Sequence, residues 1–306
     1  MLLLTGATGY LGSAVAAALS ARGDQFRCLG RSEVSCAGAE WMPLDLTDIE
    51  ALPSDAFSGV RVVVHCAGVA HRMASAVEYE QINVKATSTL AKRAALAGVR
   101  HFVYLSSLNV VPPAAADPGA PPDTFPEQDE PYARSKRHAE AALLKVCDDS
   151  GMALTVIRPA LMFDKELTAN LATLDRVLSW RPFLLPDVGC RCLVGRQDVV
   201  RLILACAEST AGAPVGQPVL VATDGERYSA RAISQLLRPR QIKREAGAFG
   251  MPVWLCQWAC RLLDWRRHLP IGSTWRALSA EHWCGAAGDI VGWRPMLTLQ
   301  TRLGRG

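Results

Sequence analysis

The stretch from Leu2 to Leu19, LLLTGATGYLGSAVAAAL, decides the fold. A short apolar run has the length of a buried strand, and Gly6, Gly9 and Gly12 follow it in G-x-x-G-x-x-G spacing before an alanine-rich helix. Glycines at this junction permit a tight turn and let the backbone approach a pyrophosphate, while the helix N-terminus offers free N–H groups. A plain strand-to-helix turn would also contain glycines, but the order of strand, glycines and helix favours a dinucleotide-binding loop.

Strand and helix patterns alternate through the first half of the chain. Strands are expected at residues 2–5, 25–29, 61–68, 101–107 and 153–159, with helices at 10–22, at 78–97 and after Pro131. Such alternation predicts an α/β fold, a Rossmann-like doubly wound parallel sheet that binds ligands at the carboxyl ends of its strands. We expect residues 1–160 to form an NAD(P)-binding domain to which 192–210 and 217–223 return. Residues 161–306 are expected to form a smaller, mixed and interleaved substrate-binding part.

The composition excludes several classes of protein. The 306 residues are 50% hydrophobic and 20% charged, which is globular, and a net charge of +4 is too small to indicate a nucleic-acid partner. Ten cysteines lie scattered, without C-x-x-C or a metal-like cluster, and the start of the chain lacks the pattern of an export signal. We therefore expect reduced thiols, no metal and a cytoplasmic location.

The turn after the second expected strand bears on the choice of cofactor. An acidic residue at this place typically binds the ribose 2′-hydroxyl of NAD, whereas an arginine suits the 2′-phosphate of NADP. The chain reads CLGRSE here, with Arg31 and Ser32 in the turn and Glu33 after them. Arg31 as a solvated loop residue, with Glu33 in the acidic role, is the competing interpretation. The residues favour NADP over NAD by a small margin.

A second pattern lies in EPYARSKRHAE, Glu130 to Glu140. Pro131 suits the first position of a helix, and on that helix Tyr132 and Lys136 share one face because they stand four residues apart. A solvated helix face would show the same spacing, so the pair alone does not establish a site.

Several motifs in order resemble the extended short-chain dehydrogenase/reductases, in the branch of NAD(P)-dependent sugar-nucleotide epimerases and dehydratases. The resemblance covers nearly the whole chain. It rests on TGATGYLG, PLDLTD, VVHCAGVA, INVKATSTLAKRAALAGVRHFVYLSS, PYARSK, VIRPA, RCLVGRQDVVRLI and the terminal GDIVGWRPMLTLQTRLG.

The resemblance implies a role for each matching position. Ser107, Tyr132 and Lys136 match the catalytic residues, and Asn109 and Arg191 are candidates for contacting substrate. Residues implied in cofactor binding are Gly6, Thr8, Gly9, Tyr10, Leu11, Gly12, Arg31, Ser32, Asp45, Leu46, Ala67, Gly68, Asn83, Tyr132 and Lys136. Structural alternatives stay open, such as a helix cap for Asp45 and an edge-strand arginine for Arg191.

These roles describe a proton relay. Tyr132 would exchange a proton with a sugar hydroxyl while hydride moves to or from the nicotinamide. Because a tyrosine pKa of about 10 makes a poor base, Lys136 and the nicotinamide ring are expected to lower the pKa of Tyr132. Ser107 would orient the reacting oxygen.

The expected function is therefore movement of a hydride at C4 of a nucleotide-activated sugar, as a 4-epimerase or 4-ketoreductase in bacterial surface-polysaccharide assembly, by a homodimer. Leu108 and Asn109 stand where 4,6-dehydratases carry an Asp-Glu pair, so that elimination is disfavoured. Two alternatives stay open: a reductase of a non-sugar ketone, and a dinucleotide-binding sensor or scaffold without turnover.

Two further segments carry predictions. The Pro-rich stretch 110–131 is expected to be a flexible loop beside the active site. Trp254, Trp258, Leu262 and Trp265 form one helical stripe near several arginines. The preferred interpretation is a helix packed on the core, and the alternative is weak peripheral binding to an anionic membrane. Residues 227–306 carry thirteen Lys and Arg against four Asp and Glu, which favours an anionic partner.

Overall fold

The computed structural model describes residues 1–70, 74–113, 115–164, 171–172, 174–176, 185–209, 219–237, 252–267, 275, 279–281 and 292–302. Its centre is a seven-stranded sheet in the order β3-β2-β1-β4-β5-β6-β9, in which every pairing is parallel. The strands are β1 (Leu2–Thr5), β2 (Phe26–Gly30), β3 (Ala39–Pro43), β4 (Val62–His65), β5 (His101–Leu105), β6 (Ala153–Pro159) and β9 (Val219–Ala222). The order reverses between β1 and β4, which is the switch point where doubly wound folds bind ligands.

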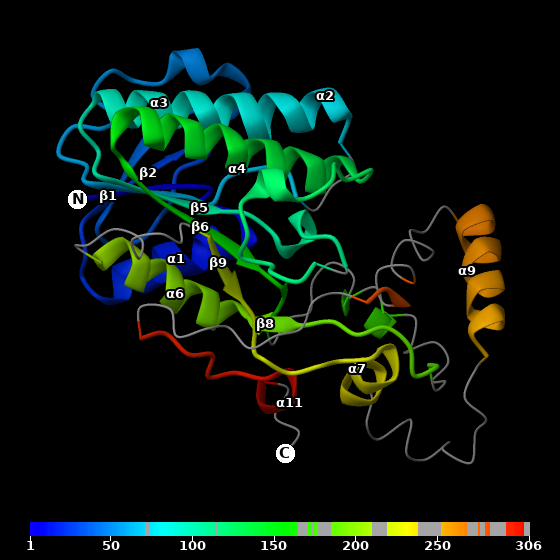
Figure 1. Cartoon of the computed structure of the whole chain (residues 1–306). Helices are drawn as coiled ribbons and strands as arrows, with labels where there is room; N and C mark the ends of the chain where they lie inside the picture. Colours follow the sequence, from blue (N-terminus) through cyan, green and yellow to red (C-terminus); the bar gives the residue numbers. More distant parts are fainter. Residues whose placement is uncertain are drawn as a thin grey trace.

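Helices cover both faces of this sheet (Figure 1). One face carries α3 (Thr87–Leu96) and α4 (Pro131–Ser150), and the other carries α1 (Tyr10–Ala21) and α6 (Arg196–Glu208). Two apolar cores result, one containing Leu90 and Leu143 and the other containing Val15 and Ile203. The predicted Rossmann-like α/β fold is confirmed.

Two elements from later in the chain lie beside the sheet or its helices. β9 pairs with β6 from Val219 to Ala222, and α6 packs beside α1. The remaining C-terminal part has β7 (Leu161–Phe163) paired in parallel with β8 (Leu193–Gly195), together with α7 (Ala230–Leu237), α9 (Val253–Arg267) and α11 (Leu299–Arg302). It has a core of its own around Phe163, Ile233 and Leu299. The exact division at residue 160 stays a prediction.

Two elements differ from the sequence-based expectation. Strand β3 was not predicted, because an edge strand that is only partly buried and ends in proline gives no apolar run. The helix expected at 78–97 begins earlier, with α2 (Ala76–Tyr79), and passes through the π-helical segment η2 (Glu80–Ala86) before α3. Such π-helical turns are frequent at functional sites.

Candidate active site

The glycine loop joins β1 to α1 in a form that only glycine permits at its first position. Gly6 has φ +74°, and a Cβ there would lie 2.6 Å from the backbone nitrogen of Ala67. Gly9 caps α1 without a side-chain hydrogen bond, whereas α2 and α4 are capped by Ser75 and Glu130. The first N–H groups of α1 therefore have no side-chain cap, as an anion-binding helix start requires. Thr8 lies in the turn, and Tyr10, Leu11 and Gly12 form the first turn of α1.

The residues expected to select the cofactor meet at the carboxyl ends of β2 and β3. Arg31 and Ser32 follow β2 directly and are exposed. Asp45 caps the short helix η1 (Leu46–Ala51), with its carboxylate accepting from the Thr47 N–H at 2.9 Å. This hydrogen bond chiefly lowers the pKa of Asp45, and the positive charge of Arg31 lowers it further. The capping alternative for Asp45 is thus present in the structure.

Tyr132 lies at the start of α4, where the helix cap fixes it. The Glu130 carboxylate accepts from the N–H groups of Tyr132 and Ala133 at 3.1 and 2.7 Å, and Pro131 occupies the first turn as expected. Ser107, which follows β5, lies close to Tyr132. Desolvation nevertheless raises the pKa of Tyr132 to about 12, although the Ser107 contact lowers it. The structure thus brings Ser107 and Tyr132 together.

Lys136 lies one turn further along α4 and is buried. Its ammonium donates to the Leu105 carbonyl at 2.8 Å and lies 4.7 Å from the centre of the Tyr104 ring. Burial lowers the pKa of Lys136 to about 8, against the opposing influence of Cys66 and Glu140. In the protein alone the pKa of Tyr132 is raised rather than lowered. Lys136 alone therefore does not produce the expected lowering of the Tyr132 pKa, and a bound nucleotide would be needed for it.

A small space beside Lys136 is enclosed by Gly68 and Asn83. A Cβ at Gly68 would lie 3.0 Å from Asn83 Oδ1 and 3.5 Å from Lys136 Nζ, so any larger residue would fill this space. Asn83, on η2, accepts from the Val69 N–H at 2.8 Å and donates to the Val69 carbonyl and the Ser135 hydroxyl, both at 3.0 Å. It thereby joins the loop after β4 to α4, and Ala67 lies in the same loop.

A buried ion pair beneath these residues was not anticipated. Glu140 and Arg158 are fully buried, with Arg158 donating to both carboxylate oxygens at 3.1 and 2.5 Å. The Ser106 hydroxyl also donates to Glu140. The signal was available, because Glu140 stands four residues after Lys136 and Ser106 directly precedes Ser107. Glu140 thus contacts Ser106, beside Ser107, and lies on α4 one turn after Lys136.

The same arginine holds the Pro-rich stretch 110–131. Arg158 Nη1 donates to the carbonyls of Pro118 and Ala120 at 2.7 and 2.8 Å, and Arg137 Nε donates to Pro122 O at 2.8 Å. The Phe125 ring is buried under Arg158. The expectation of a flexible loop is wrong for its described residues, because these contacts fix it to β6 and α4.

Arg196, to which the sequence assigned no role, lies beside the glycine loop. Its guanidinium is 4.5 Å from the centre of the Tyr10 ring, donates to Ser13 Oγ at 2.9 Å and lies 3.5 Å from Asp164. It therefore ties the start of α6 to the first turn of α1. No distinctive motif marks this arginine, since the contacts bring together residues that lie far apart in the sequence.

The two candidate substrate residues lie in different surroundings. Asn109 is exposed and donates its backbone N–H to Ser107 Oγ at 3.2 Å. Arg191 is buried and forms a two-way backbone bridge with Tyr228. Leu108, at the other position of the missing carboxyl pair, is buried. The structure thus places Asn109 next to a catalytic candidate and Arg191 in the C-terminal part.

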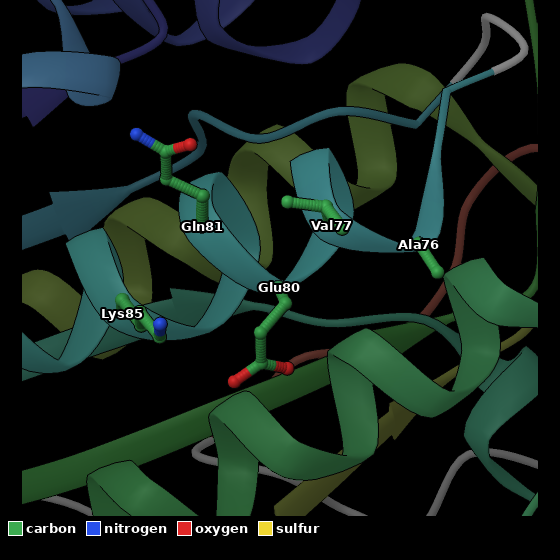
Figure 2. A pocket seen from close by; sticks show the side chains of 5 residues that line it. All are labelled: Ala76, Val77, Glu80, Gln81 and Lys85. Atoms are coloured by element: carbon green, nitrogen blue, oxygen red, sulfur yellow. The ribbon is translucent and has the colours of Figure 1, made fainter.

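A surface hollow lies elsewhere, on the outer side of α2 and η2 (Figure 2). Its lining consists of Ala76, Val77, Glu80, Gln81 and Lys85, none of which belongs to the predicted site. Among the residues that the structure describes, no cluster of His, Cys, Asp and Glu is arranged to hold a metal ion. None of the cysteines described there forms a disulfide, and five of them are buried.

The residues at the carboxyl end of the sheet fit a dinucleotide. The uncapped start of α1 suits a pyrophosphate, Arg31 after β2 suits a ribose 2′-phosphate, and Gly68 leaves the backbone beside Lys136 without a side chain. These features lie along the ends of β1, β2, β4 and β5, as a ligand crossing the switch point would need.

Comparison with known proteins points the same way. The family model described as "NAD dependent epimerase/dehydratase family" matches residues 2–221. The chain is 28% identical to a UDP-glucose 4-epimerase of Vibrio cholerae, over 98% of this chain and 92% of that protein. It is 29% identical to a 4-hydroxy-2-methyl-3-oxo-4-farnesyl-3,4-dihydroquinoline-1-oxide ketoreductase of Stigmatella aurantiaca, over 90% and 80%.

A solved structure has the same fold. MoeE5, in complex with UDP-glucuronic acid and NAD, superposes with a TM-score of 0.73 at 20% identity and covers 99% of this chain and 96% of its own.

Proposed function

The chain belongs to the NAD-dependent epimerase/dehydratase family, and on that premise we propose that it moves a hydride at C4 of a nucleotide-activated sugar. The observation that carries this proposal is that Ser107 lies close to Tyr132, with Lys136 buried one helical turn away. The family relationship makes the chain an NAD(P)-dependent enzyme. The proposal adds the reacting carbon and the residues responsible.

Ser107 and Tyr132 would both hydrogen-bond the oxygen on the reacting carbon. In the reducing direction, Tyr132 gives its hydroxyl proton to a ketone oxygen as the carbon gains hydride. In the oxidising direction, the phenolate removes the proton of the alcohol as hydride leaves. A bound nicotinamide supplies the hydride acceptor or donor, and its oxidised ring would stabilise a nearby phenolate.

The ionisation of Tyr132 bears on the direction of the reaction. With a pKa of about 12, the phenol is protonated at neutral pH in the protein alone. A protonated phenol is the form that donates to a ketone, and both ketoreduction and the second half of epimerisation use it. The epimerase alternative requires the phenolate, and therefore needs oxidised nucleotide bound before the proton can leave.

The cofactor that we propose is NADP(H), by a small margin over NAD(H). Arg31 is exposed at the end of β2, where its guanidinium could pair with a 2′-phosphate, and Ser32 stands beside it. Glu33 follows them and is the group that would favour NAD, since its carboxylate could accept from ribose hydroxyls. Titration of the purified protein with NADPH and NADH decides between them. Tighter binding of NADH would remove the preference.

A nucleoside diphosphate is the proposed recognition element of the substrate. The Vibrio relative is a UDP-glucose 4-epimerase, and the MoeE5 structure contains UDP-glucuronic acid. In this chain, the buried Arg191 is the candidate for a contact with the diphosphate. A non-sugar ketone is the second candidate, because the Stigmatella relative is a ketoreductase that matches over 90% of this chain.

One experiment separates these candidates. The protein is denatured, the released nucleotide is identified, and fresh protein is assayed with UDP-glucose, with a UDP-4-keto sugar plus NADPH, and with an apolar ketone plus NADPH. Tightly held NAD with interconversion of UDP-hexoses indicates an epimerase. NADPH consumption with only the keto sugar indicates the reductase. Consumption with only the apolar ketone would contradict the sugar proposal.

Three further expectations remain proposals. They are a homodimer, a cytoplasmic location and a place in bacterial surface-polysaccharide assembly. Sedimentation of the purified protein tests the first. For the described helices, none combines the length and hydropathy needed to cross a bilayer.

A further inference from the structure

Helix α9 turns aromatic side chains toward solvent. Trp254 and Trp258 are 67% and 59% exposed, and Val253 beside them is 37% exposed. Cys256, on the other side of the helix, is only 4% exposed, and Leu255 is partly buried. The prediction that this tryptophan stripe packs on the core is therefore wrong for its first two members. The helix contacts the protein through its Cys256 side and presents its indoles outward.

These indoles form a cluster rather than isolated exposed groups. Of the six large hydrophobic side chains that are exposed in the described residues, three lie within the first two turns of α9. Single exposed apolar residues are ordinary, but adjacent ones mark an interaction surface.

The charge of the C-terminal part of the sequence indicates the kind of partner. Residues 227–306 carry thirteen basic against four acidic residues, a balance of +9, so the first 226 residues carry −5 of the total of +4. The sequence of α9 contains three arginines and one aspartate. An anionic surface would attract this part of the molecule and repel the rest, which orients the protein.

The shape of the surface favours a fluid partner. α9 stands at the edge of the molecule, away from the central sheet (Figure 1). A projecting helix enters a lipid headgroup layer without needing a complementary groove, and indoles prefer that layer because they combine an apolar ring with an N–H donor. With 15 residues, α9 is suited to lying on a membrane rather than crossing it.

We propose that α9 docks the protein on an anionic membrane surface, with Trp254 and Trp258 inserted at the level of the headgroups. The proposal does not depend on which substrate the enzyme uses.

The test is co-sedimentation of the full-length protein with vesicles of phosphatidylcholine alone or with phosphatidylglycerol added. Wild-type protein is expected to bind the anionic vesicles and to dissociate as salt is raised. The double variant Trp254→Ala/Trp258→Ala should bind roughly tenfold more weakly or worse. Leu96→Ala is the control, since it removes an apolar side chain on α3 that is even more exposed, at 88%, and should leave binding unchanged.

Several outcomes would overturn the proposal. They are no binding of wild-type protein to anionic vesicles, equal binding by the double variant, or self-association through α9 that the double variant abolishes without any vesicle binding. If the double variant does not fold, quenching of wild-type tryptophan fluorescence by brominated lipids decides instead. Quenching supports insertion, and its absence contradicts it.

Discussion

Helices α4 and α9 each carry a stripe of side chains four residues apart, and the two stripes face opposite environments. On α4 the stripe is Tyr132, Lys136 and Glu140, and its two charged members are buried. On α9 it begins with Trp254 and Trp258, which are exposed. Hydrophobicity alone would place these stripes the other way round.

The difference lies in what surrounds each helix. Charged groups are buried only where partners satisfy them, and α4 has such partners in the Leu105 carbonyl, the Tyr104 ring and Arg158. The face of α9 that carries Trp254 is exposed to solvent. A stripe in a sequence therefore identifies a face, and only the neighbours determine what covers that face.

The largest effect is expected where the buried pair is broken. Arg158→Ala leaves the Glu140 carboxylate buried without its main partner, and should lower the free energy of unfolding by about 3–5 kcal/mol. Arg93→Ala is the control, because it breaks an exposed pair with Glu50 and should cost about 1 kcal/mol or less. Urea unfolding measures both. Similar losses of unfolding free energy in the two variants would show that burial of the Arg158–Glu140 pair does not determine its contribution to stability.

Removal of the buried ammonium should have the next largest effect. Lys136→Met is expected to lower kcat/KM by about 100-fold, since Tyr132 and the cofactor would lose a positioned cation. Lys145→Met, an exposed position on the same helix, provides the control. Steady-state kinetics on both proteins checks this. Unchanged activity in the Lys136 variant would exclude it from the mechanism.

A smaller change is expected when only the charge of Glu140 is removed. Glu140 raises the pKa of Lys136, which is about 8, so Glu140→Gln should lower that pKa. The charged lysine would then be lost at lower pH, and the basic limb of kcat/KM should move down by about one pH unit. An unmoved limb in a variant of normal thermal stability would contradict the coupling.

The smallest effect is expected on α9. Trp258→Ala should change the free energy of unfolding by no more than about 0.5 kcal/mol, because the indole is exposed. Trp293→Ala should cost about 3–5 kcal/mol, because that indole is buried and donates to the Asp198 carbonyl at 2.9 Å. Thermal or urea unfolding compares them. A large loss of unfolding free energy in Trp258→Ala would indicate that α9 packs on the core through this side chain.

Local sequence patterns predicted much of this structure. The glycine spacing after β1 and the strand–helix alternation indicated the sheet and the edge that binds ligands. The Tyr132–Lys136 spacing indicated one face of α4, and family motifs added Ser107. Asp198 lies in the first turn of α6, and its carboxylate accepts from the N–H groups of Met296 and Leu297 at 3.1 and 2.9 Å.

What could not be predicted depends on contacts between distant segments. Arg196 reaches Ser13 across 183 positions, and Arg158 reaches Pro118 across 40, so no local pattern reports either. The fixed position of the Pro-rich stretch follows from those contacts rather than from its composition. The raised pKa of Tyr132 likewise comes from desolvation by neighbours that the sequence does not place.

The central claim is that Tyr132 transfers the proton while hydride moves, and Tyr132→Phe tests it most directly. The variant should bind NADPH as tightly as wild type, while its rate with the substrate that wild type turns over should fall by about 1,000-fold or more. Tyr79→Phe, which alters a ring 6.1 Å away, should stay close to the wild-type rate. A Tyr132→Phe protein that binds nucleotide and keeps the wild-type rate would contradict the mechanism.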